Sequence, residues 1–270
     1  MKIFIDSAKL DEIKEAYSLG ICDGVTTNPS LIKAAVNDLK KKGENIDMAG
    51  YIEKILKVAY GTPVSLEVTG YRYDDMVRQA MNIFERFDPI SENVVVKLPI
   101  NTSHGNTNID LDGIAAIKKL SDAKIPVNAT LIFTPEQALM AAKAGADFVS
   151  PFAGRIDDDL RTKNKLVFKK TDYFPAYGLS EGILDDNGVV SGIDLVEQTV
   201  DILRTHKYAA QVIAASIRNA RQAREAALVR ADIATLPLPV IKDMLCHHKT
   251  REGMESFIAD IVPEYEDLIK

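Results

Sequence analysis

The sequence has few of the residues that define several protein classes. Its two cysteines, Cys22 and Cys246, are far apart and form no C-x-x-C motif, so neither a disulfide framework nor a cysteine zinc site is predicted. We expect both to be small buried hydrophobic residues. Four scattered histidines argue against a metal centre built from clustered His, Asp and Glu ligands.

The sequence also lacks a net positive charge and long apolar runs. The formal net charge of −6 argues against a nucleic acid or an anionic membrane as a partner, because both require a positive surface. The N-terminus, M-K-I-F-I-D-S, has a charge at its sixth residue, and no apolar run approaches the roughly 20 residues of a membrane helix. A cytoplasmic location is therefore expected. The G-x-G-x-x-G and G-x-x-x-x-G-K-[S/T] motifs are absent, which argues against an open dinucleotide-binding sheet and against a phosphate loop.

What the chain does contain is an alternation of strand-like and helix-like segments. Its 270 residues, 46% of them hydrophobic, are typical of one large α/β domain, which we predict to span residues 1–270. Several strand candidates are apolar on both faces, as expected of a parallel sheet that is covered outside and packed inside. The eight strand candidates are Lys2 to Asp6, Gly24 to Thr27, Val64 to Val68, Val94 to Leu98, Val127 to Ile132, Phe148 to Pro151, Gln211 to Ser216 and Asp232 to Leu236.

Seven segments with apolar residues at three-to-four-residue spacing are predicted helices. Thr134-Pro135 is typical of a helix start, and Gly145 of a helix end. Eight strands with interleaved helices predict a closed (β/α)8 TIM barrel of the α/β class. The predicted helices are Ser7 to Leu19, Asp47 to Ala59, Tyr71 to Phe87, Asp110 to Ser121, Thr134 to Ala144, Gly192 to Thr205 and Asn219 to Leu228.

Polar side chains gather at the ends of the predicted strands. In a barrel of this kind the active site forms where the strands end and the following loops begin, so these side chains are expected to face one mouth. They include Asp6, Thr27, Asn28, Glu67, Lys97, Asn128, Thr130, Ser150, Arg155, Ser216 and Arg218.

Lys97 lies between Val96 and Leu98 in an apolar strand, where an ammonium group loses hydration. A neutral amine there can attack a carbonyl and form an iminium ion, which withdraws electrons from a neighbouring carbon–carbon bond. Two structural alternatives remain open: the side chain extends to solvent at the rim, or it pairs with Glu67.

The two carboxylates also allow two interpretations each. Asp6 caps the first helix, a task that Ser7 can also perform, or it moves the proton of a substrate hydroxyl. Glu67 is an ion-pair partner, or it acts on a water molecule that Thr130 helps to hold.

Arg155, Ser216 and Arg218 follow the sixth and seventh strands. Together with the opening amides of a helix they can form an anion pocket, which suggests a phosphate ligand. The alternative is that both arginines pair with the acidic segment near Asp157 to Asp159.

Several motifs occur in the order found in one enzyme family, from Met1 to about Leu238. They are F-I-D-S, G-V-T-T-N-P-S-L-I, V-V-V-K-L-P, P-V-N-A-T-L-I-F, F-V-S-P-F-A-G-R-I-D, A-A-S-I-R-N-A-R-Q and T-L-P-L. On these motifs the chain resembles the transaldolase family, including its fructose-6-phosphate aldolase branch.

The resemblance implies a role for each residue. Lys97 matches the Schiff-base lysine, Asp6 the proton-transferring aspartate, and Glu67 with Thr130 the pair that handles the catalytic water. No metal and no organic cofactor is implied. Substrate contacts are implied for Thr27, Asn28, Asn128, Ser150 and Phe152, and phosphate contacts for Arg155, Ser216 and Arg218.

The resemblance also separates two reactions. Transaldolases pass a dihydroxyacetone unit from a ketose phosphate to an aldose phosphate, whereas the aldolase branch releases free dihydroxyacetone. In that branch glutamine replaces Glu67 and tyrosine replaces Phe152, so this chain is expected to be a transaldolase. The implied donors are sedoheptulose 7-phosphate and fructose 6-phosphate, and the implied acceptors are glyceraldehyde 3-phosphate and erythrose 4-phosphate.

Two segments depart from the compact family members. Residues 101–108 follow the lysine strand on the catalytic side, where His104 either contacts substrate or is solvated. The extended loop at about 157–190 either covers the site or lies at its rim.

The C-terminal helical segment at about 238–270 carries Met254, Phe257, Ile258 and Ile261 at helical spacing. This stripe covers its own barrel or another surface. Because the terminal helix of compact family members reaches a neighbouring subunit within a ring, the resemblance implies a homo-oligomer: a pentamer or decamer, with a dimer as the alternative.

Overall fold

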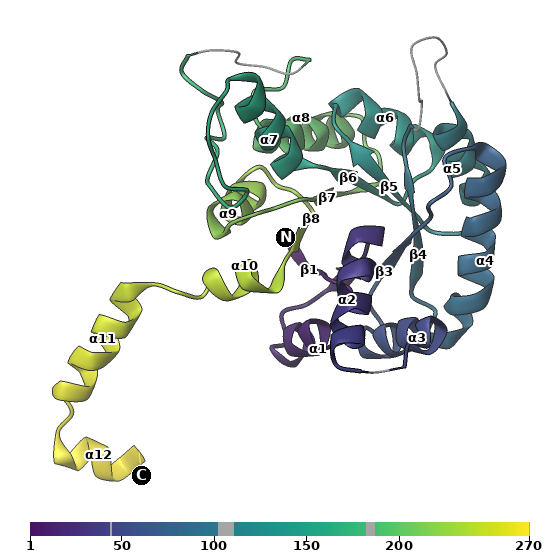
Figure 1. Ribbon diagram of the computed structural model, residues 1–270. Helices are drawn as coiled ribbons and strands as arrows, with labels where there is room; N and C mark the ends of the chain where they lie inside the picture. Colours follow the sequence, from purple (N-terminus) through teal and green to yellow (C-terminus); the bar gives the residue numbers. More distant parts are fainter. Residues whose placement is uncertain (44, 102–110, 182–186, 270) are drawn as a thin grey trace.

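The computed structural model describes residues 1–43, 45–101, 111–181 and 187–269 (Figure 1). Eight parallel strands pair in sequence order, and the last pairs with the first to close a barrel. The predicted (β/α)8 barrel is therefore confirmed. His104 and residues 102–108 of the predicted loop lie outside the described residues.

Each strand lies within two residues of its predicted range, because each is an apolar run that ends at polar or turn-forming residues. Ser216, predicted as the end of the seventh strand, instead has a left-handed φ of 61° and lies beyond the strand. The strands are β1 (Lys2–Asp6), β2 (Gly24–Thr26), β3 (Val64–Glu67), β4 (Val94–Pro99), β5 (Val127–Ile132), β6 (Phe148–Pro151), β7 (Gln211–Ala214) and β8 (Ile233–Leu236).

Helices surround the barrel and bury their apolar faces against the strands (Figure 1). α6 follows the predicted signals: Thr134 and Gln137 form a capping box at its start, and Gly145 ends it with a left-handed φ of 100°. The helices between strands are α1 (Leu10–Ser18), α2 (Pro29–Lys41), α3 (Met48–Val58), α4 (Tyr73–Ser91), α5 (Asp112–Asp122), α6 (Pro135–Ala144), α7 (Ala153–Lys163), α8 (Gly192–Thr205) and α9 (Ala220–Leu228).

Two of these helices, α2 and α7, were not predicted. Asn28 caps α2 by accepting a hydrogen bond from the Leu31 amide, and Pro29 occupies its first position. In α7 the apolar stripe is short, with Ile156 and Leu160 buried one turn apart. The extended loop expected at about 157–190 therefore begins too early, because residues 157–163 belong to α7. The irregular connection starts at Asn164.

The C-terminal segment forms three helices, α10 (Leu238–Asp243), α11 (His248–Ala259) and α12 (Pro263–Ile269). α10 buries Leu238, Val240 and Ile241 against the barrel. α11 and α12 extend away from it as an arm (Figure 1), and neither helix contains a buried residue. The alternative in which the stripe on α11 covers its own barrel is therefore wrong.

The structure also tests the predictions for the two cysteines and for membrane helices. Cys22 is half-buried, but Cys246 is exposed beside the start of the arm, so the prediction of a buried thiol is wrong for Cys246. Among the described residues, no helix combines the length and apolar character needed to cross a membrane.

Candidate active site

A cavity of about 370 Å³ opens at the carboxyl ends of the barrel strands. Eight of the twelve predicted site residues line it, contributed by five different strands or the segments that follow them. They are Asp6, Asn28, Lys97, Ser150, Phe152, Arg155, Ser216 and Arg218. The other four, Thr27, Glu67, Asn128 and Thr130, lie directly around these residues.

Lys97 points into the barrel and is 4% exposed. Its Nζ lies 3.0 Å from Glu67 Oε2 and donates a hydrogen bond to the Thr27 carbonyl oxygen at 3.0 Å. The register explains the ion pair, because Glu67 on β3 is the direct partner of Lys97 on β4. Extension of this side chain to solvent is thus excluded, and the pairing with Glu67 is present.

Asp6 ends β1 and lines the same cavity. Its Oδ1 accepts a hydrogen bond from Thr26 Oγ1 at 2.8 Å. Burial raises the pKa of the Asp6 carboxyl, although Lys97, the Thr26 hydroxyl and Arg218 act in the opposite direction. Asp6 does not cap α1: it is Ser7 that accepts a hydrogen bond from the Lys9 amide. The carboxylate is therefore left to face the cavity.

Thr130 is fully buried on β5, and its hydroxyl has no hydrogen-bond partner within the described part of the chain. The β5–β6 register shifts between Ala129 and Ile132, where Leu131 has a left-handed φ of 56°. Thr130 thus lies at an irregular strand end, two residues beyond Asn128, which pairs in register with Lys97.

The remaining polar residues form a linked layer. Ser150 Oγ donates to Asn128 Oδ1 at 2.7 Å, and Asn128 Nδ2 donates to Ser65 Oγ at 3.1 Å. Thr27 Oγ1 donates to the Ser65 carbonyl at 2.8 Å. Asn28 uses its Oδ1 to cap α2, which leaves its amide group available to a ligand in the cavity.

The predicted anion pocket combines Arg155 on α7 with Ser216 and Arg218, which follow β7. Arg155 places its guanidinium 4.9 Å from the centre of the Phe152 ring. Arg218 Nε donates to the carbonyl and hydroxyl oxygens of Ser216, both at 3.2 Å. Its terminal nitrogen lies 3.0 Å from Asp158 Oδ2, so the predicted pairing with the acidic segment is present for Arg218.

Gly154 allows this close packing. A Cβ added there would lie 2.2 Å from the Ser216 carbonyl oxygen and 2.9 Å from Arg218 Nε. The start of α7 and the arginine can therefore approach only because residue 154 has no side chain.

Sequence reasoning missed several lining residues. Thr26 and Thr235 share a hydrogen bond between their hydroxyls and line the cavity. Thr26 is visible in the sequence as a polar residue at a strand end, but no role was predicted for it, and Thr235 was not predicted at all. Lys170 comes from the connection after α7, and no local pattern predicts its position. Ser30, Leu31 and Ala215 complete the lining. No group of metal-ligating side chains occurs among the residues that the structure describes.

Comparison with known proteins shows the family of this chain. The family model described as Transaldolase/Fructose-6-phosphate aldolase matches residues 3–268. Proteins named probable transaldolase from Chlorobaculum parvum and Chlorobium limicola are each 42% identical over 260 residues, covering 96% of this chain and 97% of theirs. One from Desulforapulum autotrophicum is 38% identical over the same shares of both chains.

Among solved structures, that of a mandelate oxidase is similar to this chain. The TM-score is 0.50, and the identity is 12% over 88% of this chain and 65% of the oxidase chain. This likeness concerns the barrel alone. The barrel, its lysine-containing cavity and the relatives together define an enzyme. More particularly, the chain belongs to the transaldolase/fructose-6-phosphate aldolase family.

Proposed function

We propose that this enzyme is a transaldolase that carries a dihydroxyacetone unit on Lys97, from a ketose phosphate to an aldose phosphate. The observation that carries the proposal is the buried Lys97 amine, which lies between the Glu67 carboxylate and a cavity lined by Asp6 and two arginines. The donors are sedoheptulose 7-phosphate and fructose 6-phosphate, and the acceptors are glyceraldehyde 3-phosphate and erythrose 4-phosphate.

The Lys97–Glu67 ion pair differs by the position of one proton from the form in which the Lys97 amine is a nucleophile. When Glu67 takes a proton from the Lys97 ammonium across 3.0 Å, the neutral amine can attack the ketone carbon of the donor. Loss of water then gives an iminium ion. We assign that water to Glu67 and to the Thr130 hydroxyl, which has no hydrogen-bond partner among the described residues. They act both when the water leaves and when it returns to release the product.

Asp6 is the base for bond cleavage. Its ionised carboxylate accepts the proton of the hydroxyl on the carbon at the far end of the breaking bond. That C–O bond becomes the carbonyl of the departing aldose phosphate, and the electrons of the broken bond move into the iminium to give an enamine. The raised pKa of Asp6 suits the reverse step, in which the carboxyl returns the proton to the acceptor oxygen. Asn28, Asn128, Ser150, Thr27 and Phe152 are assigned to orienting the substrate hydroxyls and chain.

The phosphate is assigned to Arg155, Ser216 and Arg218. All three line the cavity, and guanidinium groups bind phosphate oxygens through paired hydrogen bonds. A substrate held there by its phosphate can extend its ketone toward Lys97.

Transfer is favoured over release because the chain has Glu67 and Phe152, the residues that the resemblance associates with transaldolases. The test is to incubate the enzyme with fructose 6-phosphate, with and without glyceraldehyde 3-phosphate, and to measure sedoheptulose 7-phosphate and free dihydroxyacetone. We expect sedoheptulose 7-phosphate with the acceptor and little dihydroxyacetone without it. Rapid release of dihydroxyacetone in the absence of acceptor would identify the aldolase reaction instead.

We also infer that the protein is a homo-oligomer in which the arm formed by α11 and α12 packs on a second copy of the chain. Phe257 is 72% exposed and Ile258 is 63% exposed, and helices this short are marginal in water without tertiary packing. The arm extends away from its own barrel (Figure 1), so another subunit must cover it. A cytoplasmic location remains a prediction.

Phe257→Glu is expected to reduce the native mass measured by light scattering, because it puts a charge in the apolar contact. The matched control is Ser256→Glu, at the adjacent exposed position of the same helix, which should keep the wild-type mass. An unchanged mass for Phe257→Glu, or a monomeric wild type, contradicts this arrangement.

A further inference from the structure

The connection between α7 and α8 brings a third cation to the phosphate side of the cavity. Lys170 lines the cavity together with Arg155 and Arg218. Within the described part of the chain, no carboxylate forms an ion pair with its ammonium group, whereas Arg218 shares its charge with Asp158 at 3.0 Å. A sugar phosphate carries nearly two negative charges at pH 7. The positive charge of Lys170 is therefore not neutralised by another described residue and is available to a phosphate.

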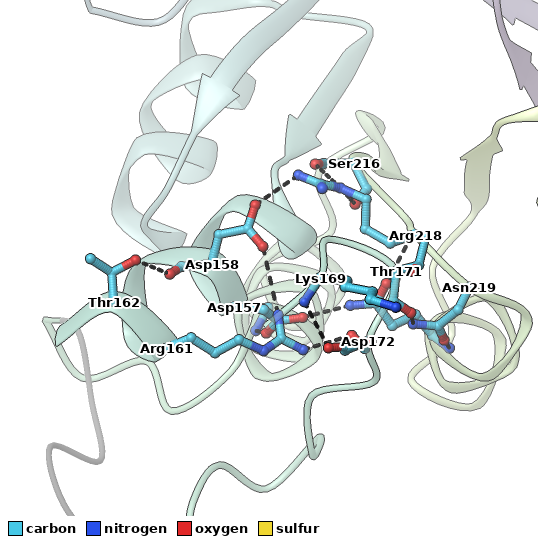
Figure 2. A network of polar contacts seen from close by, with 12 residues as sticks. Asp157, Asp158, Arg161, Thr162, Lys169, Thr171, Asp172, Ser216, Arg218 and Asn219 are labelled. Atoms are coloured by element: carbon cyan, nitrogen blue, oxygen red, sulfur yellow. Dashed lines mark hydrogen bonds and ion pairs between the residues drawn. The ribbon is translucent and has the colours of Figure 1, made fainter. Parts of the chain in front are cut away.

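The turn that carries Lys170 is held on both sides. Asp172 Oδ2 accepts from the Lys169 amide at 2.7 Å, and the Asp172 amide donates to the Lys169 carbonyl at 2.9 Å, which closes the turn around Lys170 (Figure 2). The Thr171 carbonyl accepts from Asn219 Nδ2 at 3.3 Å. Because Asn219 also caps α9, this contact fixes the turn to the helix that follows the phosphate-binding segment.

The same connection is anchored by two aromatic residues that follow the turn. Phe174 is buried in a cluster with Ile156, Leu160 and Val189. Tyr173 donates its hydroxyl hydrogen to Glu225 on α9 at 2.7 Å. The connection thus packs against α7 and α9, and the turn at its start has a defined position over the cavity.

A buried arginine links this turn to the phosphate site. The Arg161 guanidinium lies 5.0 Å from the ring centres of both Phe168 and Phe174, and it donates to the Asp172 carbonyl at 2.6 Å. Its other nitrogen lies 3.6 Å from Asp158 Oδ1, while Asp158 Oδ2 contacts Arg218. Asp158 therefore lies between the two arginines, as Figure 2 shows, and joins the Lys170 turn to Arg218.

We propose that Lys170 is a phosphate-binding residue that increases the preference of this enzyme for phosphorylated sugars over unphosphorylated ones. The inference rests on the proposed function and adds a residue to its phosphate site. Lys170 binds the phosphate oxygens together with Arg155 and Arg218, which line the same cavity. Because the ammonium is exposed, its effect decreases as the ionic strength rises.

The test compares Lys170→Gln with Lys169→Gln, which removes the neighbouring charge from the same turn. Lys169 is not among the described residues that line the cavity. Lys170→Gln is expected to raise KM for erythrose 4-phosphate about 5- to 10-fold, with little change in kcat, as for loss of one charge-assisted hydrogen bond. KM for unphosphorylated glyceraldehyde should stay constant, and Lys169→Gln should match the wild type.

A calorimetric titration with inorganic phosphate tests Lys170 without any chemistry at Lys97. Weaker binding to Lys170→Gln than to Lys169→Gln supports the inference, and equal binding overturns it. If the wild type transfers no dihydroxyacetone unit, the proposed function fails, and this titration alone then decides the role of Lys170. Normal transfer with equal KM values in both variants overturns the role of Lys170 and leaves the proposed function intact.

Discussion

Replacing Lys97 by alanine is expected to lower kcat for transfer by about 10⁴-fold or more, the scale typical of losing a covalent nucleophile. No other amine is expected to replace it: Lys170 at the mouth of the cavity is the other lysine among the described lining residues, on a separate connection. The measurement is the steady-state rate of sedoheptulose 7-phosphate formation from fructose 6-phosphate and glyceraldehyde 3-phosphate.

Controls must show that the lower kcat of Lys97→Ala results from the missing amine and not from an unfolded protein. Alanine leaves the Glu67 carboxylate without the partner that lies 3.0 Å away, so a thermal melt should accompany the assay, and Lys97→Met serves as a variant that keeps more of the volume. Lys118→Ala is the matched control, because it removes an exposed lysine that pairs with Asp122 on α5. The role of Lys97 is refuted if the folded variant retains turnover near that of the control.

Replacing Asp6 by asparagine is expected to lower kcat by about 10²- to 10⁴-fold, the usual contribution of a general base. Asparagine retains an oxygen that can accept the Thr26 hydrogen bond, so the site should keep its geometry. The variant should still form the iminium at Lys97, because that step uses Glu67. Carbon–carbon cleavage should fail.

Borohydride reduction separates these two steps. With fructose 6-phosphate the wild type should retain a three-carbon adduct, whereas Asp6→Asn should retain the uncleaved six-carbon sugar phosphate. The pH profile gives a second test: cleavage requires an ionised Asp6, so kcat should fall as the pH decreases through the raised pKa of this carboxyl. A three-carbon adduct in Asp6→Asn, together with a pH profile of kcat that is unchanged on its acidic side, would assign the base to another group.

The barrel could be predicted from the sequence because each strand is a short apolar run and each predicted helix has a continuous apolar stripe. The pairing of Glu67 with Lys97 could be foreseen because both residues end adjacent strands. α6 was predictable to within a residue because Thr134, Pro135 and Gly145 mark both of its ends. Features that depend on neighbouring residues in the sequence therefore appear in the structure as predicted.

Features that depend on distant contacts could not be predicted in the same way. α7 has a short apolar stripe because much of its surface binds Asp172 through Arg161 and Arg218 through Asp158, and neither contact leaves a periodic pattern. Lys170 reaches the cavity through a turn that Asn219 holds from another helix. The exposure of α11 could not be predicted because an apolar stripe is the same whether it covers a barrel or a second subunit.

Identification of the reduced Schiff base is the most direct test of the account. The wild-type enzyme would be treated with fructose 6-phosphate and borohydride, digested, and analysed by mass spectrometry. The account predicts a three-carbon adduct on the peptide that contains Lys97, and none when the sugar is omitted. An adduct on a different lysine, or an unmodified Lys97 in an enzyme that still turns over, would contradict it.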